Sequence, residues 1–257
     1  MLKINNLTVQ YGERIIVDSA SFSVNESEWT MLIGPNGAGK STIVSAISQG
    51  VPYTGSVVYC GEDVACMKPT EIARRIGVLA QNNHVAYSFS VDEIVRLGRY
   101  CYSPGVFGTM NDSDLEQIQT ALDMTGMTAL RNQSALTLSG GELQRVFLAQ
   151  IFAQDPCLLI LDEPINHLDL AYQKQIFDLI RNWIKKPGRA VLSVVHDLNF
   201  ARAYGTHAVL LNRGQIVSCG IIDEVITKEN LEDVYDVDVY AWMRTMLSQW
   251  ENRVFDG

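Results

Sequence analysis

The first third of the chain alternates between short apolar runs and turn-forming residues, which predicts strands. Two loosely alternating segments flank Tyr11-Gly12 and are expected to pair as antiparallel strands. A short apolar run then ends at a glycine-rich loop, after which we expect a helix over residues 41–49 with Gly50 as its C′ residue. The strands are expected over residues 2–9, 15–24, 29–33, 56–59 and 76–80.

Between residues 82 and 155 the pattern changes from strands to amphipathic helices. Residues 91–97 predict a helix with acidic residues in its first turn, and residues 100–110 predict a loop. The segment Ser113 to Glu116 has the spacing of a capping box in front of an apolar stripe. A third helix is expected from Ser139, so we interpret this region as a mostly helical lobe inserted into an α/β core.

The α/β core resumes after this lobe. Residues 157–161 and 190–195 are rich in branched aliphatic residues without alternation, which is typical of fully buried parallel strands. With a helix between them, they predict a βαβ crossover, and a late hairpin is expected over residues 209–218. The helix is expected over residues 172–184, with an apolar stripe of Ile176, Leu179, Ile180 and Trp183.

Composition narrows the class of protein. Apolar residues make up 47% of the 257 residues and charged residues 19%, so we expect an ordered chain with a sizeable core. The formal charge of −9 gives no basic footprint for nucleic acid. The five cysteines lack CxxC spacing, which favours a reducing compartment and no zinc site. Without a signal peptide or an 18-residue apolar run, the chain is expected to be soluble and to reach a membrane only through a partner.

The segment Gly34 to Ser41 fits the pattern GxxxxGK[ST] between a predicted strand and a predicted helix, which is the context of a phosphate-binding loop. Its glycines allow successive backbone N–H groups to wrap a phosphate at the helix N-terminus. Lys40 is expected to contact the outer phosphates, and the Ser41 hydroxyl is placed to ligate Mg²⁺. A flexible glycine turn without a ligand is the alternative.

The apolar run at residues 157–161 ends in two carboxylates, Asp162 and Glu163. They are expected at the carboxyl edge of the sheet, where ligands bind in open α/β folds. Asp162 can hold the hydration shell of Mg²⁺, and Glu163 can orient or deprotonate an attacking water. An acidic turn without chemistry is the alternative.

Leu138 to Glu142 read Leu-Ser-Gly-Gly-Glu, and Ser139 with Glu142 predicts a capping box. Capping leaves Gly140 and Gly141 unexplained, because glycine in a first helical turn costs about 1 kcal/mol relative to alanine. A serine and two glycines at a helix start form an anion site, so this corner is also expected to hold a phosphate.

These three motifs, in this order, resemble the nucleotide-binding subunit of ABC transporters over residues 1–220. The resemblance implies a P-loop NTPase fold of class α/β, with an N-terminal antiparallel β part and a helical subdomain at about 82–155. The tail at 221–257 is expected to pack on the core, with an exposed docking surface as the alternative; it carries Tyr235, Tyr240, Trp242 and Trp250.

The resemblance also implies a homodimer that closes head to tail on ATP and Mg²⁺. Each ATP would lie between one phosphate loop and Ser139, Gly140, Gly141 and Glu142 of the partner subunit. Within one copy, Tyr11 would stack on adenine, and the other ATP contacts would come from Gly34, Pro35, Asn36, Gly37, Ala38, Gly39, Lys40, Ser41 and Thr42.

Catalytic roles follow from the same resemblance. Gln81 would reach Mg²⁺ and the attacking water, and His196 would contact the γ-phosphate, beside Lys40 and Glu163. The dimer-interface loop would consist of Asn166, His167, Leu168 and Asp169. His84, His167 and His207 are expected to be structural or surface residues without a catalytic role. This sequence departs from the family at Glu142, where many members have glutamine, and at Ile165, where a hydroxyl residue is common.

Residues 91–100, 166–170 and 196–201 look like the ATPases of bacterial importers for iron-siderophores, haem and cobalamin, among which we favour ferric siderophores. This resemblance implies a peripheral subunit on the cytoplasmic face of the inner membrane, with a permease and, indirectly, an extracytoplasmic binding protein as partners. The permease is expected to contact Tyr87, Phe89 and Tyr100. The alternatives are a haem, cobalamin or metal-ion importer, a soluble ABC ATPase acting on nucleic acid, and a regulatory module that binds ATP without hydrolysing it.

Overall fold

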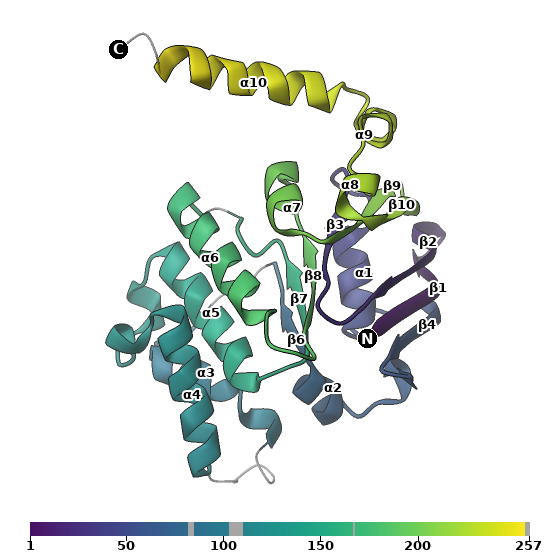
Figure 1. The fold of residues 1–257 in the computed structure, drawn as a ribbon. Coiled ribbons are helices and arrows are strands. Elements are labelled where there is room, and N and C mark those ends of the chain that lie inside the picture. Colours follow the sequence, from purple (N-terminus) through teal and green to yellow (C-terminus); the bar gives the residue numbers. More distant parts are fainter. Residues whose placement is uncertain (82–84, 103–109, 167, 255–257) are drawn as a thin grey trace.

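The computed structural model describes residues 1–81, 85–102, 110–166 and 168–254. These residues form two sheets, a lobe of helices and a C-terminal helix that stands apart (Figure 1). The expected fold class is confirmed: an α/β core with an N-terminal antiparallel part and a helical lobe inserted between core strands.

A six-stranded sheet with the order β10-β9-β3-β8-β7-β6 forms the centre of the molecule. The neighbours from β9 to β6 run parallel, and β10 pairs antiparallel with β9. Strands β7 and β8 pair directly, which confirms the predicted crossover through α6 (Leu170–Trp183). The strands are β3 (Trp29–Ile33), β6 (Ile76–Leu79), β7 (Leu158–Asp162), β8 (Ala190–Val194), β9 (His207–Asn212) and β10 (Gln215–Ile221).

The second sheet is antiparallel and has the order β2-β1-β4-β5. Its first hairpin closes where Tyr11 pairs with Arg14, and Gly12 adopts the positive φ of 59° that the tight turn needs. The strands are β1 (Leu2–Tyr11), β2 (Arg14–Val24), β4 (Thr54–Tyr59) and β5 (Glu62–Asp63).

The central sheet buries an apolar cluster on each face because its strands are apolar on both sides. Leu158 and Ile160 belong to the cluster shared with the antiparallel sheet and α1 (Lys40–Ile47), whereas Leu159 and Leu161 belong to the cluster shared with the lobe. Helix α1 is therefore held between the two sheets, which fixes the position of its N-terminus. Helix α2 (Pro69–Arg75) precedes β6.

We call α3, α4 and α5 the helical lobe. Each begins with a capping box, and a buried ion pair in which Arg99 Nε donates to Asp114 Oδ1 at 2.8 Å reinforces the lobe. The helices are α3 (Val91–Leu97), α4 (Asp112–Thr125) and α5 (Gly140–Gln154), with single-turn helices at Tyr100–Tyr102, Thr128–Leu130 and Ala135–Thr137. A further single turn, Val64–Cys66, lies before α2.

The predicted end of α1 is two residues too late, and the predicted C′ residue is one residue too late. The helix ends at Ile47, and Gln49 rather than Gly50 takes the left-handed backbone, with φ 59°. The N–H of Gly50 donates to the Ser45 carbonyl at 2.7 Å, which is the bond that closes a Schellman motif. Gly50 therefore occupies the C″ position, where its conformational freedom is not required.

The predicted cap of α4 is also wrong, because Ser113 lies inside the first turn of that helix. Asn111 is the N-cap and Asp114 completes the capping box. On α6, Phe177 is fully buried and Leu179 is only half-buried, so the apolar stripe is rotated relative to the one predicted.

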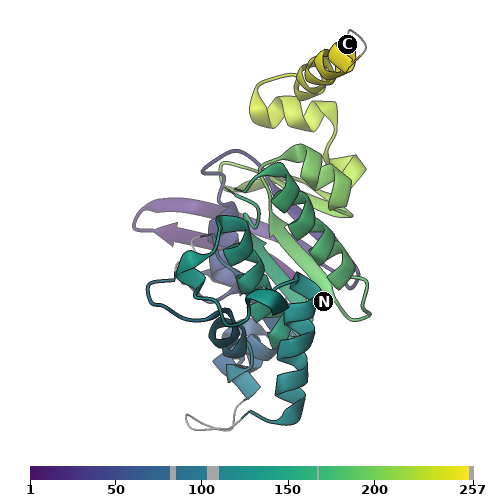
Figure 2. The ribbon, with the colours of Figure 1, turned by 90° about the vertical axis from the view of Figure 1, so that its left-hand side faces the viewer.

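The C-terminal part begins with α7 (Leu198–Tyr204) and α8 (Ile222–Val225), and continues with α9 (Lys228–Tyr235) and α10 (Val239–Val254). Tyr235 and Tyr240 pack against the core, whereas Trp242 and Trp250 are 55% and 74% exposed. Helix α10 and the helical lobe lie at opposite ends of the molecule (Figure 1 and Figure 2). Among the residues that are described, no helix combines the length and the apolar character needed to cross a bilayer.

Candidate functional site

The glycine-rich loop connects β3 to α1, as predicted. Its backbone conformation requires glycine at two positions, Gly34 and Gly39. Gly34 and Gly39 have φ of 144° and 102°, and a Cβ on Gly34 would lie 2.2 Å from the Leu211 carbonyl oxygen. Gly39 is the N-cap of α1 and no side chain caps this helix start. Its backbone N–H groups therefore suit an anionic ligand.

Lys40 is buried at the base of this loop. Its Nζ donates to the carbonyl oxygens of Gly34 at 2.7 Å and Pro35 at 2.9 Å. Burial lowers the pKa of Lys40 below its usual value, and the carboxylates of Glu163 and Asp162 oppose this shift. Lys40 is thus a buried cation whose ammonium is held on two backbone carbonyls, an arrangement that suits an anionic ligand.

Ser41 and Asp162 meet across the cleft from different elements. The Ser41 hydroxyl donates to Asp162 Oδ1 at 3.1 Å, between the start of α1 and the end of β7. Burial raises the pKa of Asp162, and the hydrogen bond from Ser41 opposes this rise. The Ser41 hydroxyl and the buried Asp162 carboxylate are two oxygen ligands of the kind that Mg²⁺ prefers. A Mg²⁺ ion held here would take its other ligands from phosphate and water. No larger cluster of acidic, histidine or cysteine side chains suited to a metal occurs in the described ranges.

Glu163 is the most strongly fixed side chain of the cleft. Its Oε2 accepts from Gln81 Nε2 at 2.6 Å and from Asn166 Nδ2, and its Oε1 lies 2.5 Å from His196 Nε2. The backbone of Glu163 has φ 53°, a strained value for a non-glycine residue that is typical of functional sites. The carboxylate is 8% exposed, so its position is set by these partners rather than by solvent.

One cleft of about 570 Å³ at the carboxyl edge of the central sheet is lined by Lys40, Ser41, Glu163 and the three partners of Glu163, whereas Asp162 is not part of its lining. Of the predicted ATP contacts, Gly34, Pro35 and Ala38 do not line the cleft, and neither does Tyr11, whose side chain is 52% exposed. Sequence reasoning missed Ile16 on the cleft wall and the contact of Asn166 with Glu163. The lining residues are Ile16, Asn36, Gly37, Gly39, Lys40, Ser41, Thr42, Gln81, Glu163, Asn166 and His196.

We call Ser139, Gly140, Gly141 and Glu142 the Ser139 corner, and none of these residues reaches this cleft. Ser139 caps α5, its N–H donates to Glu142 at 2.8 Å, and no residue of the corner lines the cleft around Lys40. Gly141 has a packing reason that the sequence did not reveal, because a Cβ there would lie 2.5 Å from the ring of Tyr172. Gly140 faces open space, with its nearest neighbour at 3.9 Å.

The predicted interface loop serves several local purposes. Asn166 holds Glu163, Leu168 packs against the core, and Asp169 caps α6 by accepting from the Tyr172 N–H at 3.0 Å. Ile165 is buried in the core, which accounts for an apolar residue at this position. His167 and His84 lie outside the described residues, and His207 faces Glu28 at 3.4 Å.

Comparison with known proteins shows one family. The ABC transporter family model matches residues 17–166. The uncharacterized ABC transporter ATP-binding protein YvrA of Bacillus subtilis is 36% identical over 93% of this chain, which spans only 54% of that protein. The iron(3+)-hydroxamate import ATP-binding protein FhuC of Bacillus subtilis is 37% identical, with 92% of this chain and 88% of that protein covered.

A hemin import ATP-binding protein, HmuV of Bartonella quintana, is 38% identical, with 91% of this chain and 90% of that protein covered. Among solved structures, an inward-facing metal-chelate type ABC transporter is 26% identical with a TM-score of 0.80, covering 92% of this chain and 89% of its own. A dimeric bacterial ABC transporter cassette is 26% identical with a TM-score of 0.75, covering 86% and 99%.

Proposed function

Because this chain belongs to the ABC transporter family, we propose that it is the ATP-hydrolysing subunit of an iron-siderophore importer. Two copies would close head to tail on two ATP molecules, and a permease would convert this closure into transport. The names of the relatives support iron chelates as the cargo class, and haem import is the second candidate because of the similarity to HmuV.

One observation carries the proposal of a shared site. The cleft brings Lys40, Ser41 and Glu163 together, yet no residue of the Leu138–Glu142 motif of the same copy lines it. A helix start with an accessible glycine suits a phosphate. A second copy of the chain would supply such a helix start at the open side of the cleft. Neither copy alone would then surround the γ-phosphate.

The reaction asks little covalent chemistry of the protein, because phosphoryl transfer depends on position and charge. The start of α1 and Lys40 would hold the phosphates, and Glu163 would orient the attacking water and accept its proton. Gln81, Asn166 and His196 would keep Glu163 in place. Ser41 and Asp162 would hold Mg²⁺, which supplies positive charge to the phosphate oxygens. Tyr11 would contact adenine from outside the cleft.

The partners follow from the surface and from the relatives. Tyr87, Phe89 and Tyr100 are 73%, 43% and 64% exposed, and the rings of Tyr87 and Phe89 lie 6.3 Å apart. We propose that they receive a permease helix. The subunit would lie on the cytoplasmic face of the membrane, and an extracytoplasmic binding protein would deliver the cargo to the permease.

The test of the shared site uses Glu163→Gln, which keeps the shape of the side chain but removes the base. We expect hydrolysis to fall by about 10²-fold or more and a stable ATP-bound dimer to accumulate in sedimentation velocity. Glu62→Gln, at an exposed ion pair with Arg75, is the control and keeps full activity. Brisk hydrolysis by single copies at saturating ATP would refute the shared site.

The test of the permease contact uses Tyr100→Glu. This variant is expected to hydrolyse ATP normally and to fail to assemble with the permease, because a charge replaces the exposed ring. Val217→Glu, at an exposed position on β10, is the control for adding a surface charge. Normal assembly and transport in Glu variants at Tyr87, Phe89 and Tyr100 would reject this contact.

The test of the cargo uses the subunit assembled with its permease in vesicles. Stimulation of hydrolysis by a binding protein loaded with ferric hydroxamate rather than haem would support the siderophore assignment.

A further inference from the structure

Helix α10 carries an apolar stripe that the protein leaves largely uncovered. Its first turn is anchored, since Val239 is buried and Met243 packs against the core. Beyond this anchor, Trp242, Met246, Leu247 and Trp250 are 55%, 47%, 65% and 74% exposed. The spacing of 242, 246 and 250 places three of these residues on one face of the helix. Contiguous apolar surface of this kind marks an interaction site.

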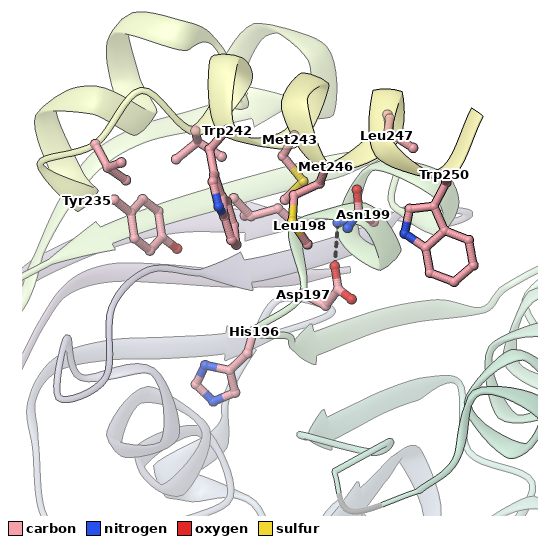
Figure 3. Close-up of a pocket in the computed structure, with 12 residues that line it drawn as sticks. His196, Asp197, Leu198, Asn199, Tyr235, Trp242, Met243, Met246, Leu247 and Trp250 are labelled. Carbon is pink, nitrogen blue, oxygen red and sulfur yellow. Dashed lines mark hydrogen bonds between the residues drawn. The ribbon is translucent and has the colours of Figure 1, made fainter. Parts of the chain in front are cut away.

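The stripe forms one wall of a groove of about 540 Å³. The opposite wall is the segment from His196 to Asn199, where β8 leads into α7, and Tyr235 closes one end (Figure 3). His196 also lines the cleft around Lys40 and contacts Glu163. The groove is therefore continuous with the surface on which the second copy would close.

The distribution of charge along the C-terminal part favours a second copy of α10 as the occupant of this groove. Residues 223–238 contain seven acidic residues and one basic residue, so two copies of this segment would repel one another. Residues 239–254 contain only Arg244, Glu251 and Arg253 as charged residues, a net charge of +1. A helix of this composition can pair with itself at little electrostatic cost, and it lacks the basic face that a helix on an anionic membrane surface carries.

We propose that the α10 helices of two copies pack against each other, each placing its apolar stripe in the groove of the other. Building on the head-to-tail dimer proposed above, this contact holds the two copies together without nucleotide. It is isologous, so every residue of the stripe contributes twice.

The size of the stripe sets the strength of this contact. A tryptophan side chain presents about 150–250 Å², so two partly exposed tryptophans with Met246 and Leu247 offer a few hundred Å² per copy. The total lies near or below the roughly 1,000 Å² of a stable interface, which corresponds to weak association. Such a contact keeps the copies at high effective concentration while the ATP sites open and close.

The experiment measures self-association of the full chain without nucleotide. Trp29 and Trp183 are fully buried, so any change in tryptophan emission with concentration reports on the other two tryptophans, Trp242 and Trp250. We expect a concentration-dependent dimer in sedimentation velocity together with a shift of the emission to shorter wavelength. A chain that stays monomeric at all concentrations with unchanged emission overturns the proposal.

Two matched variants locate the contact. Met246→Glu places a charge on the stripe, keeps both reporter tryptophans, and is expected to weaken nucleotide-free association at least tenfold. Thr245→Glu adds the same charge at an exposed position outside the stripe, about 100° around α10 from Met246, and is expected to leave association unchanged. Circular dichroism checks that both variants fold. Equal behaviour of the two variants overturns the proposal, as does a Met246→Glu variant that dimerises normally and fails only to assemble with the permease.

A second arm separates this proposal from the ATP-dependent dimer. Glu163→Gln combined with Met246→Glu is expected to lose the nucleotide-free dimer and still to dimerise at saturating ATP. If Glu163→Gln alone does not dimerise with ATP, the proposed function fails, whereas the nucleotide-free result continues to test α10. If the double variant dimerises without nucleotide as strongly as Glu163→Gln, the α10 contact fails and the shared ATP site stands.

Discussion

The molecule contains two glycine-rich helix starts, which differ in whether a side chain of the chain itself caps them. Helix α1 begins after Gly39 with no side-chain cap and no acidic residue in its first turn. Helix α5 begins after Ser139 with a complete capping box, and Glu142 brings its own negative charge to the helix dipole. The start of α1 is therefore capped by no side chain of its own, whereas the start of α5 is already stabilised within the chain.

The glycines of the two starts also have different causes. At Gly34 and Gly39 the backbone conformation and close neighbours demand glycine. At Gly141 the Tyr172 ring demands it, and at Gly140 the structure places nothing within ordinary contact except Leu168 at 3.9 Å. One start is thus shaped by its own loop, whereas the other keeps one glycine position that no close neighbour within the chain constrains.

The largest expected effect comes from Lys40→Met at the start of α1. Hydrolysis should fall by about 10²- to 10³-fold, because the charge that faces the outer phosphates is removed. Folding should not suffer, since burial depresses the Lys40 pKa and the buried charge is itself unfavourable. Phosphate release measures the rate, and Ser48→Ala at the other end of α1 is the control. Unchanged hydrolysis would contradict the assignment of Lys40.

The next effect compares Ser139→Ala with Ser90→Ala. Both variants remove the N-cap of a helix in the lobe that has a glutamate at N3, so each should lose about 1 kcal/mol of unfolding free energy in urea. Only Ser139→Ala should also slow hydrolysis, by about 10- to 100-fold, through the loss of a hydrogen bond to a charged phosphate. Equal hydrolysis rates in the two variants would reduce the Ser139 corner to a structural cap.

A smaller effect distinguishes the two glycines of α5. Gly141→Ala should destabilise the protein by about 1–3 kcal/mol, because the new Cβ lies 2.5 Å from the Tyr172 ring. Gly140→Ala should stabilise it by about 0.5–1 kcal/mol and slow hydrolysis by crowding the shared phosphate. Thermal unfolding gives the sign of each change. A destabilised Gly140→Ala variant would show that this position is constrained within the chain.

The smallest effect is the pH dependence of the α5 cap. Hydrogen bonds from the Ser139 N–H and hydroxyl lower the pKa of Glu142, so its charged form stabilises the folded state above pH 4.5 and this contribution is lost as the pH falls through the lowered value. Glu142→Gln keeps an acceptor without the charge. Its melting temperature should lie slightly below that of the parent at pH 7 and approach it in acid; a constant difference would assign no role to the charge.

Local sequence was sufficient where spacing along the chain defines the structure. The loop Gly34 to Ser41, the run into Asp162 and Glu163, and the capping box of Ser139 with Glu142 were all predicted correctly as local structures. The end of α1 and the cap of α4 were not, because several neighbouring residues can serve as cap and packing selects among them. Their proposed roles in catalysis stay predictions until the variants above are measured.

The sequence by itself determined the order of the central-sheet strands and of the lobe helices, because periodicity and backbone constraints act over a few positions; α2 and α7 to α10 were not predicted from it. Only the tertiary structure decided which side chains meet. Gln81 and His196 lie 82 and 33 positions from Glu163, and they reach its carboxylate because β6, β7 and β8 are neighbours in the sheet. In the same way, the packing of α5 on α6 decided that Gly141 must be glycine, and the place where α10 leaves the core decided that its tryptophans remain exposed.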